Sequence, residues 1–318
     1  MILTITPNPA IDVTFPVADL VPGSVYHMQT MLESPGGKGI NVANVLAKLG
    51  EPVLATGFSG GPQGQRLEQM LRARGIRYEF VKTKAATRRS TIITDPVHGA
   101  TVFNEAGKSP SLAEWEQLFA LVSKLGSFPA SHNRENVVTV NGSFAPDVPS
   151  DTIMRLYEVA LATGAIVMVD TSGKALQLAV EAGVHAIKPN KNEMQALTGH
   201  ADPLADFEKL LRRVNFVMCT LGRDGIAAQL RGGPLVHVPA TGFVVGNPTG
   251  AGDSTTAAIA RSIARDNLAA AADPRVLARW LSEARALGAA TVAAKVAGEF
   301  DAELYARLRS ATFSAANL

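Results

Sequence analysis

Cysteine is almost absent from this sequence. Among its 318 residues there is a single one, Cys219, so an intrachain disulfide is excluded and a cysteine-rich metal cluster cannot form. Proteins that do without disulfides are typical of reducing compartments. We therefore expect a cytoplasmic protein.

Aromatic residues and charge of one sign are also scarce. Aromatic residues make up 6% of the chain, the formal net charge is +2, and no long basic run occurs. A nucleic-acid partner is therefore not expected. No run of about 18 uninterrupted apolar residues occurs, and the start "MILTITPNP" lacks the features of an export signal. We expect no membrane partner, and small molecules as ligands.

Apolar residues, in contrast, are plentiful at 47%, enough for a large buried core. Short apolar runs rich in β-branched residues alternate with amphipathic, helix-like stretches. Strands buried on both faces between such helices predict an α/β sandwich with a mainly parallel sheet. The predicted strands are 137–140, 165–170, 185–190 and 215–220, and the predicted helices are 149–164, 174–183, 203–214 and 274–296.

Two segments depart from this alternation. Residues 11–34 and 88–105 resemble short strands joined by Pro/Gly turns. We expect them to pair as a small sheet beside the core, which would serve as a lid that excludes water. Because no internal repeat or low-complexity linker occurs, we treat residues 1–318 as one domain.

The first glycine-rich motif is "SPGGKGINVANVLAKLG", residues 34–50. Gly36, Gly37 and Gly39 allow a ligand to approach the backbone where a helix begins, and Lys38 adds a cation. A phosphate or a polyol would suit this turn, although a tight strand-to-helix connection with a solvated lysine explains it equally well. This motif is not a P-loop. The nearest approach to a P-loop in the chain is "GKS" at 107–109, which would require a first glycine at position 102, where Val102 stands.

The second glycine-rich motif is "NPTGAGDSTTAAIA", residues 247–260. The N–H groups of Gly250, Ala251 and Gly252 could bind a phosphoryl group, with Asp253 placed to take a proton from an attacking hydroxyl. The alternative is that Asp253 is the N-cap of the following helix. A cap needs no pair of glycines before it, which favours the catalytic interpretation.

Two further segments follow buried strands. In "KPNKNE", Lys188, Asn190 and Glu193 lie at the carboxyl end of a predicted parallel strand, where open α/β folds bind ligands. Their oxygen atoms would suit Mg²⁺ through water, and a capped helix start is the alternative. In "TLGRDG", Thr220, Gly222 and Gly225 end another strand, and a plain hairpin turn is the alternative.

The predicted lid contributes charged side chains. Asp12, in "TPNPAIDVTF", is placed to accept hydrogen bonds from sugar hydroxyls, or else to form an Asx turn. Arg88 and Arg89, in "TRRS", are candidate partners for a substrate phosphate, and we expect at least one of them to be a solvated surface charge.

Taken together, these motifs resemble the pfkB, or ribokinase-like, family of sugar kinases. They are, in chain order, "TPNPAID", "GGKGINVANVLAKLG", "TRRS", "FNEAG", "NGSFAPDVP", "VDTSGKAL", "KPNKNE", "TLGRDG" and "PTGAGDS". The resemblance implies a three-layer α/β/α sandwich with a β lid, MgATP as the phosphoryl donor, and a homodimer formed through the lid.

The resemblance also implies roles for individual residues. It makes Asp253 the catalytic base and Gly250, Ala251 and Gly252 the anion hole. Asn190 and Glu193 match its NxxE motif, which acts on Mg²⁺ and phosphate. The acceptor side would comprise Asp12, Gly36, Gly37, Lys38, Asn41, Arg88 and Ser143, and the nucleotide side Lys188, Asn190, Glu193, Thr220, Gly222 and Gly225.

Within the family, the sequence most resembles the phosphosugar branch, which implies a ketohexose phosphate as the acceptor. "GGKG" and "FNEAG" are more similar to fructose-1-phosphate and tagatose-6-phosphate kinases than to 6-phosphofructokinases. Ser90, "NGSFAPDVP" and "STTAA" depart from the usual patterns and leave the acceptor open among these three. A non-catalytic phosphosugar sensor on the same scaffold is the alternative from another class of protein. A nicotinamide oxidoreductase is disfavoured because "TPNPAID" occupies the place of a GxGxxG turn.

Overall fold

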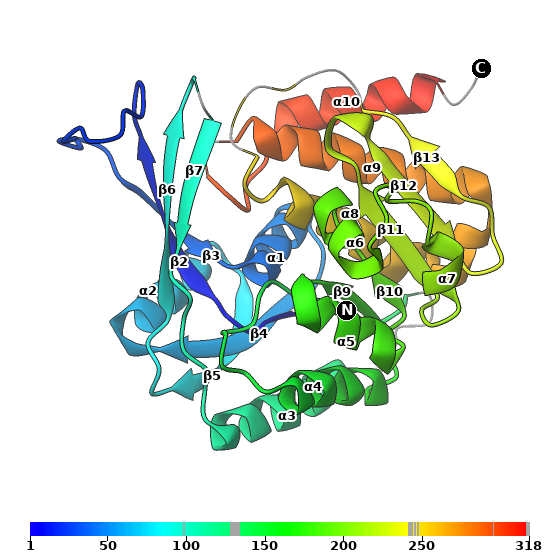
Figure 1. Cartoon of the computed structure of the whole chain (residues 1–318), viewed down its shortest axis with the longest axis horizontal. Helices are drawn as coiled ribbons and strands as arrows, with labels where there is room; N and C mark the ends of the chain where they lie inside the picture. Colours follow the sequence, from blue (N-terminus) through cyan, green and yellow to red (C-terminus); the bar gives the residue numbers. More distant parts are fainter. Residues whose placement is uncertain are drawn as a thin grey trace.

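A nine-stranded sheet lies at the centre of the molecule (Figure 1). The structure is a computed structural model that describes residues 1–97, 99–127, 134–240, 244, 246, 248–294 and 296–315. In spatial order the strands are β13 (Val236–Val238), β12 (Ile226–Leu230), β11 (Phe216–Thr220), β10 (Ala186–Ile187), β9 (Ile166–Asp170), β8 (Val137–Asn141), β1 (Ile2–Thr6), β4 (Val53–Gly60) and β5 (Arg77–Thr83).

The sheet is parallel from β5 to β11, and β12 runs antiparallel to both of its neighbours, β11 and β13. Its inner strands are buried along their whole length, as in β1 and β8. A strand that is covered on both faces has a nearly continuous apolar run rather than an alternating pattern, which is why such runs in the sequence predicted strands. The four predicted strands are confirmed as β8 to β11, although only Ala186 and Ile187 of the segment predicted over 185–190 form β10.

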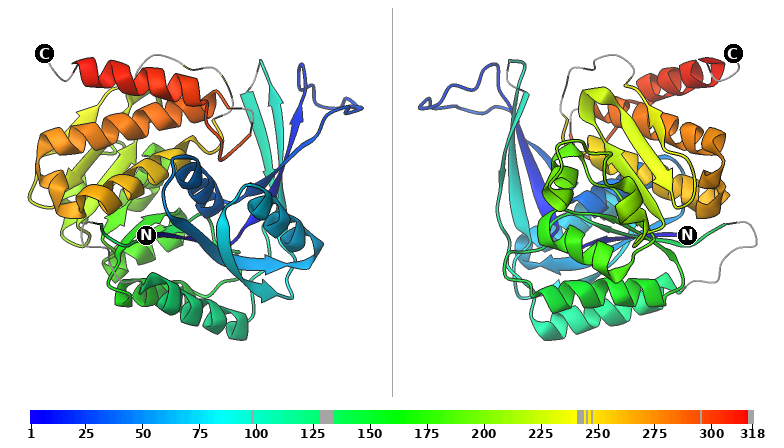
Figure 2. Two further views of the ribbon diagram at one scale, coloured as in Figure 1. Left: turned by 180° about the vertical axis from the view of Figure 1, so that it is seen from behind. Right: turned by 45° about the vertical axis from the view of Figure 1, so that its right-hand side comes forward.

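Helices cover both faces of the sheet and complete the predicted three layers (Figure 2). One layer packs its apolar side chains with Ile40, Leu67 and Trp280 in one core cluster, and the other packs around Trp115 and Tyr157 in a second. The first layer is α1 (Lys38–Lys48), α2 (Gly61–Ala73), α8 (Ala251–Asp266), α9 (Pro274–Val292) and α10 (Ala302–Ala315); the second is α3 (Leu112–Gly126), α4 (Ser150–Ala162), α5 (Gly173–Ala182), α6 (Lys191–Thr198) and α7 (Phe207–Leu211).

Two predicted helices are shorter than expected. The helix predicted over 203–214 is reduced to α7, because the Asp202 side chain accepts a hydrogen bond from the Leu204 N–H and forms a local turn instead. The helix predicted over 274–296 begins as expected, with Asp273 as N-cap and Pro274 in the first turn, but it ends at Val292. The following segment leaves the helix and packs against α1, where the carbonyl of Gly298 accepts a hydrogen bond from Asn44.

The predicted lid is a separate four-stranded sheet in the order β3 (Leu32–Gly36), β2 (Ala10–Pro16), β6 (Arg88–Asp95), β7 (Gly99–Asn104). It projects from one side of the core (Figure 1). Its strands come from the two predicted segments, 11–34 and 88–105, although residue 98 lies outside the described residues. Residues 17–31, between β2 and β3, contain no strand.

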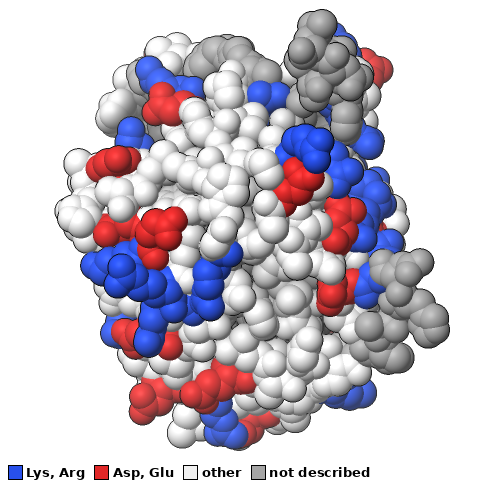
Figure 3. Space-filling view, turned by 90° about the vertical axis from the view of Figure 1, so that its right-hand side faces the viewer, with Lys and Arg blue, Asp and Glu red and all other residues white. Residues whose placement is uncertain are grey.

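The face turned away from the lid carries charges of both signs. Figure 3 shows lysine and arginine side chains there in groups bordered by acidic residues. Throughout the described part of the chain, no helix combines the length and the apolar composition needed to cross a bilayer.

Candidate functional site

The predicted site residues converge where the parallel strands end at their carboxyl termini. Asp170 is the last residue of β9, Lys188 follows β10, and the first turns of α1 and α8 begin at the same edge. Open parallel sheets bind ligands at this edge, because the loops there are held apart by the crossover helices.

Asp170 holds this group together. Its Oδ1 lies 3.0 Å from Nζ of Lys38, and its Oδ2 lies 3.0 Å from Nζ of Lys188 and 2.7 Å from the Thr256 hydroxyl. Asp170 and Lys188 are buried. Burial alone would raise the pKa of Asp170, but the two ammonium groups outweigh it and hold the pKa below its ordinary value. Asp170 is absent from the predicted site; the one signal for it is a carboxylate that ends the apolar run "AIVMVD".

Asp253 lies in the first turn of α8, but it does not cap the helix. The N-cap is Gly250, whose φ of 87° favours glycine, so the capping interpretation of Asp253 is wrong. The Asp253 carboxylate instead accepts a hydrogen bond of 2.8 Å from Nδ2 of Asn41 in α1. Burial, opposed by Lys38 and reinforced by Asp170, raises the pKa of Asp253 to about 6. Asp253 therefore binds a proton more readily than an exposed aspartate.

The start of α8 offers backbone amides to an anion. The Ala251 N–H already donates to the carbonyl of Pro248 at 3.2 Å, whereas those of Gly252 and Asp253 find no acceptor among the described residues. The N–H groups of Gly252 and Asp253 are therefore available to bind an anion. The N–H group of Ala251, which the sequence predicted for the same purpose, is already engaged. A Cβ on residue 252 would lie 3.6 Å from Nζ of Lys188, so this residue lies directly beside the ammonium group.

Asp12 lies inside β2 rather than in an Asx turn, so that alternative is wrong. It is paired in register with Ser34 of β3 and Ser90 of β6. A Cβ on Gly36 would lie 2.2 Å from Oδ1 of Asp12, so the carboxylate requires glycine there. Burial raises the pKa of Asp12 to about 7; Arg88 opposes the shift and Asp253 adds to it. The charge of Asp253 in the core therefore reaches the carboxyl group of Asp12 in the lid.

The glycine turn before α1 brings Lys38 into the same site. Gly37 is the N-cap, with a φ of 103°, and a Cβ on it would lie 2.8 Å from Cγ2 of Thr6. Lys38 also approaches Oε1 of Glu193 at 3.7 Å. Burial would lower the pKa of Lys38, but Asp170, Asp253 and Glu193 raise it above its ordinary value. Lys38 is therefore a permanent cation.

Two predicted acceptor-side residues lie beside this lysine. Asn41 is buried, and its Oδ1 has no hydrogen-bond donor among the described residues. Ser143 is exposed and follows Gly142, whose N–H donates to the carbonyl of Asp170 at 2.8 Å. The structure thus gathers Asp12, Lys38, Asn41 and Asp253 around one centre.

On the predicted nucleotide side, the structure contains the capped helix start and the hairpin turn that the sequence analysis gave as alternatives. Asn190 and Glu193 form a capping box at the start of α6, with hydrogen bonds of 2.8 and 2.9 Å. Thr220 ends β11, and Gly222 and Gly225 form the turn into the antiparallel strand β12, closed by the Leu221 N–H on the Gly225 carbonyl at 2.8 Å. Asn190 and Thr220 are bridged, so both turns lie at one edge.

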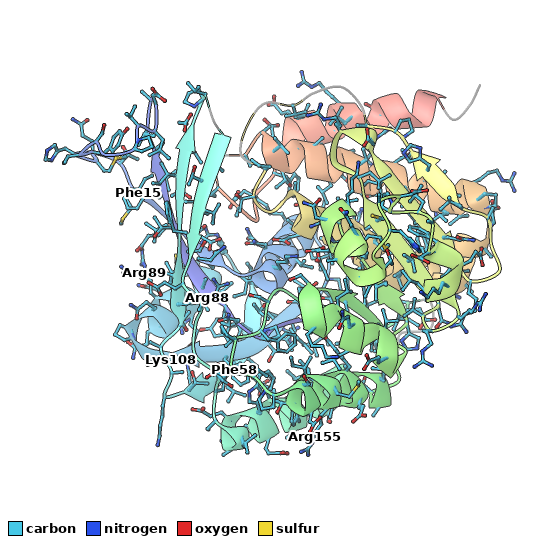
Figure 4. The ribbon with its side chains drawn as sticks, viewed as in Figure 1. Phe15, Phe58, Arg88, Arg89, Lys108 and Arg155 are labelled. Atoms are coloured by element: carbon cyan, nitrogen blue, oxygen red, sulfur yellow. The ribbon has the colours of Figure 1, made fainter. Side chains whose placement is uncertain are left out.

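Arg88 begins β6 and is fixed by two backbone carbonyls. Its Nε donates to Asn8 at 3.2 Å and its Nη1 to Glu105 at 3.1 Å. Figure 4 shows Arg88 at the base of the lid. Arg89 is the exposed surface charge that we expected of one of the two arginines.

The whole chain is similar to solved sugar kinases. Phosphofructokinase-2 from Escherichia coli, in complex with potassium, matches with a TM-score of 0.85 at 22% identity, covering 98% of this chain and 99% of that one. A Thermotoga maritima protein described as a possible 1-phosphofructokinase matches with a TM-score of 0.82 at 23% identity and 97% coverage of both chains. At this identity the likeness shows a shared fold.

A ribokinase-like structure from Agrobacterium tumefaciens has the same fold, with a TM-score of 0.76 at 17% identity, and covers 100% of this chain and 98% of that one. The family model described as "pfkB family carbohydrate kinase" matches residues 7–301. That span includes the lid, both glycine motifs and the carboxylates described above. The chain therefore belongs to the pfkB family of carbohydrate kinases.

Proposed function

We propose that this chain, acting as one kinase unit over residues 1–318, transfers the γ-phosphoryl group of ATP to a hydroxyl of a ketohexose phosphate. Carbohydrate kinases of the pfkB family use ATP with a divalent metal. The observation that carries the proposal is the buried Asp253 carboxylate, which lies beside open amides and two lysines. A phosphosugar sensor, the alternative from another class, would need no buried carboxylate with a raised pKa at such a position.

In this mechanism ATP supplies the phosphoryl group when it is bound. Asp253 accepts the proton of the acceptor hydroxyl as the new O–P bond forms and the bond to the ADP oxygen breaks. The amides of Gly252 and Asp253, with the Lys188 ammonium, stabilise the negative charge of the transferred group. Asp170 positions both lysines, so it acts through them rather than on the substrate.

The residues predicted to act on Mg²⁺ are poorly suited to bind it directly. The capping box engages the side-chain oxygen of Asn190 and Oε2 of Glu193. This leaves Oε1 of Glu193, which lies 3.7 Å from the Lys38 ammonium. Among the described residues no group of three or more His, Cys, Asp or Glu side chains could hold a metal ion. A directly coordinated ion does not fit these residues, so a contact with Mg²⁺ would pass through water.

We infer that the acceptor is fructose 1-phosphate, with tagatose 6-phosphate and fructose 6-phosphate as the alternatives. Lys38 in "GGKG" supports this choice, and so do Asp12 for sugar hydroxyls and Arg88 for the phosphate. Phosphorus NMR of the products tests it: incubation with ATP and fructose 1-phosphate should give a second phosphomonoester on the sugar together with ADP. Unchanged fructose 1-phosphate alongside a phosphorylated free sugar would contradict it.

The pH dependence of catalysis follows from the pKa of Asp253. A base must be deprotonated, so kcat/KM should fall as the pH drops through about 6, where Asp253 binds a proton. Asp12→Asn should leave this acidic limb in place, whatever its effect on KM, because the pKa of the Asp12 carboxyl is raised to about 7 and this group is largely protonated where Asp253 titrates. A wild-type profile that stays flat from pH 5 to 8 would contradict Asp253 as the base.

We also propose that the chain forms a homodimer through the lid. Val102 and Phe103 of the edge strand β7 are 40% and 59% exposed, and an uncovered edge strand with apolar residues favours pairing. Phosphofructokinase-2 from Escherichia coli is described as tetrameric in its inhibited form.

Light scattering after size exclusion tests the dimer. Phe103→Asp should give a monomer where the wild type is a dimer. Leu235→Asp, at a residue 44% exposed in the core domain between β12 and β13, should leave the mass unchanged. A wild-type monomer at micromolar concentration would show that the lid does not pair.

A further inference from the structure

Residues 297–300, between α9 and α10, have no role in the mechanism above, yet they lie against the helix that carries Asn41 (Figure 1). The contact is made by Asn44, three residues after Asn41 on the same face of α1. Its Nδ2 donates to the carbonyl of Gly298 at 2.6 Å, and both residues are buried. Because water does not compete for a buried hydrogen bond, Asn44 fixes the position of this carbonyl.

Gly298 also touches Asn41. It has a φ of 73°, and a Cβ on it would lie 2.8 Å from Oδ1 of Asn41 and 3.2 Å from its Cα. Glycine is therefore required at this position both by its backbone conformation and by the close approach to α1. The main chain of Gly298 is thus placed against two asparagine side chains of one helix.

The Asn41 amide has few other constraints. Its Nδ2 donates to Oδ2 of Asp253 at 2.8 Å, while its Oδ1 has no hydrogen-bond donor among the described residues. A single hydrogen bond leaves an amide free to turn away from its acceptor unless a neighbour blocks the movement. Gly298 is the neighbour on the Oδ1 side, so it helps to keep Nδ2 directed at the carboxylate.

The same segment touches the start of α8. A Cβ on Gly250 would lie 3.0 Å from the backbone nitrogen of Gly298 and 3.4 Å from Cα of the buried Ala297. Gly250 is the N-cap of the helix that carries Asp253. Gly298 therefore contacts both helices that form the reaction centre.

The outer contacts of the segment are more exposed. Lys48 forms an ion pair with Glu299, and its Nζ lies 5.3 Å from the centre of the Phe300 ring. The side chains of this ion pair are 41% and 29% exposed, and pairs of this kind contribute little to stability. The buried hydrogen bond of Asn44 is therefore the contact that holds the segment at the reaction centre.

We propose that Asn44 is a positioning residue for phosphoryl transfer: by holding Gly298 in place, it keeps the Asn41 amide directed at the Asp253 carboxylate. Asn44 acts through these two residues rather than on the substrate. The proposal rests on the proposed kinase function and adds to it a residue to which the family resemblance gives no role.

Steady-state kinetics of Asn44→Ala test the proposal. Without the hydrogen bond, Gly298 and the Asn41 amide can shift, and we expect kcat to fall about tenfold, because small displacements of groups at a reaction centre have effects of this order or larger. The KM for ATP should stay unchanged. Gly298→Ala, whose Cβ would displace the Asn41 amide, should lower kcat in the same way although Asn44 is present.

The pH profile distinguishes positioning from general damage to the fold. The hydrogen bond from Asn41 lowers the pKa of Asp253, so its loss should move the acidic limb of kcat/KM to higher pH. The variant leaves unaltered the other charged groups whose interaction with Asp253 shifts a pKa: Lys38, Asp170, Lys188 and Asp12.

Gln229→Ala provides the matched control. Gln229 and Asn44 are both 6% exposed, and Nε2 of Gln229 likewise donates to a glycine carbonyl, that of Gly233 at 3.0 Å, as well as to Glu208. None of these partners belongs to the reaction centre. The control should lower the midpoint of urea unfolding as Asn44→Ala does, but leave kcat and the acidic limb at their wild-type values.

Carbon NMR of protein labelled at its aspartate carboxyl groups gives a readout that does not depend on turnover. The Asp253 signal is identified by its absence in Asp253→Asn, and it should titrate at higher pH in Asn44→Ala than in the wild type. An unchanged titration, or a fall in kcat with an unmoved acidic limb, would overturn the proposal. If the titration shifts but the wild type releases no ADP with any sugar phosphate, the kinase function is refuted while the link from Asn44 to Asp253 stands.

Discussion

Asp253→Asn should make the protein more stable at pH 8 while turnover falls about 100-fold or more. The loss of turnover follows because a positioned base contributes about that factor. The gain in stability follows from the pKa of Asp253, which folding raises from 3.8 to about 6. Such a group stabilises the fold below its unfolded pKa, and this stabilisation is lost as the pH rises through the folded pKa. At pH 8 the buried carboxylate is charged, and a neutral amide of the same shape removes that cost.

The expected increase in the free energy of unfolding is about 1–3 kcal/mol at pH 8, from the size of the pKa shift. The amide oxygen of the new side chain can still accept the hydrogen bond from Asn41. Urea unfolding of both proteins at pH 8 and pH 5 measures this, and the gain should shrink at pH 5, where the wild-type carboxyl is largely protonated. A variant that is less stable at pH 8, or that keeps near-normal turnover, would contradict our account of Asp253.

The same substitution at Asp170 should have the opposite effect on stability. Asp170→Asn leaves the ammonium groups of Lys38 and Lys188 without their shared carboxylate, and Lys188 is buried. Breaking a buried pair by removing one partner costs about 3–5 kcal/mol. We expect a loss of that order in the free energy of unfolding, together with a strong loss of turnover, because both lysines lose their positions.

Glu116→Gln provides the matched control for Asp170→Asn. It breaks the ion pair of Glu116 with Arg155, in which both side chains are 53% exposed. Surface pairs contribute less than about 1 kcal/mol, so the midpoint of urea unfolding should barely change. If Asp170→Asn unfolds no more easily than Glu116→Gln, Asp170 does not hold the site together.

Most of the fold could be predicted from the sequence because its core strands are buried on both faces. The run that became β8 has no polar alternation, so only a covered parallel strand suited it. The lid segments were recognisable from their turns. The length of α7 was not, because the Asp202 side chain competes locally with the helix.

The candidate site was only partly predictable. Whether Asp253 caps its helix or faces a substrate is undecided within residues 247–260, because a first-turn aspartate suits both. The contact that decides it comes from Asn41, 212 positions away. Asp170 was missed for the same reason: its lysine partner Lys38 is 132 positions distant, and no local pattern joins them.

The rate of ADP release measured across a panel of acceptors tests the central claim most directly. Purified wild-type protein would be assayed with ATP, Mg²⁺ and, in turn, fructose 1-phosphate, fructose 6-phosphate, tagatose 6-phosphate and free fructose. We predict the highest kcat/KM for fructose 1-phosphate, a much lower value for the free sugar, and loss of the activity in Asp253→Asn. ADP release that is no faster with any sugar phosphate than without an acceptor would contradict the proposed phosphosugar kinase.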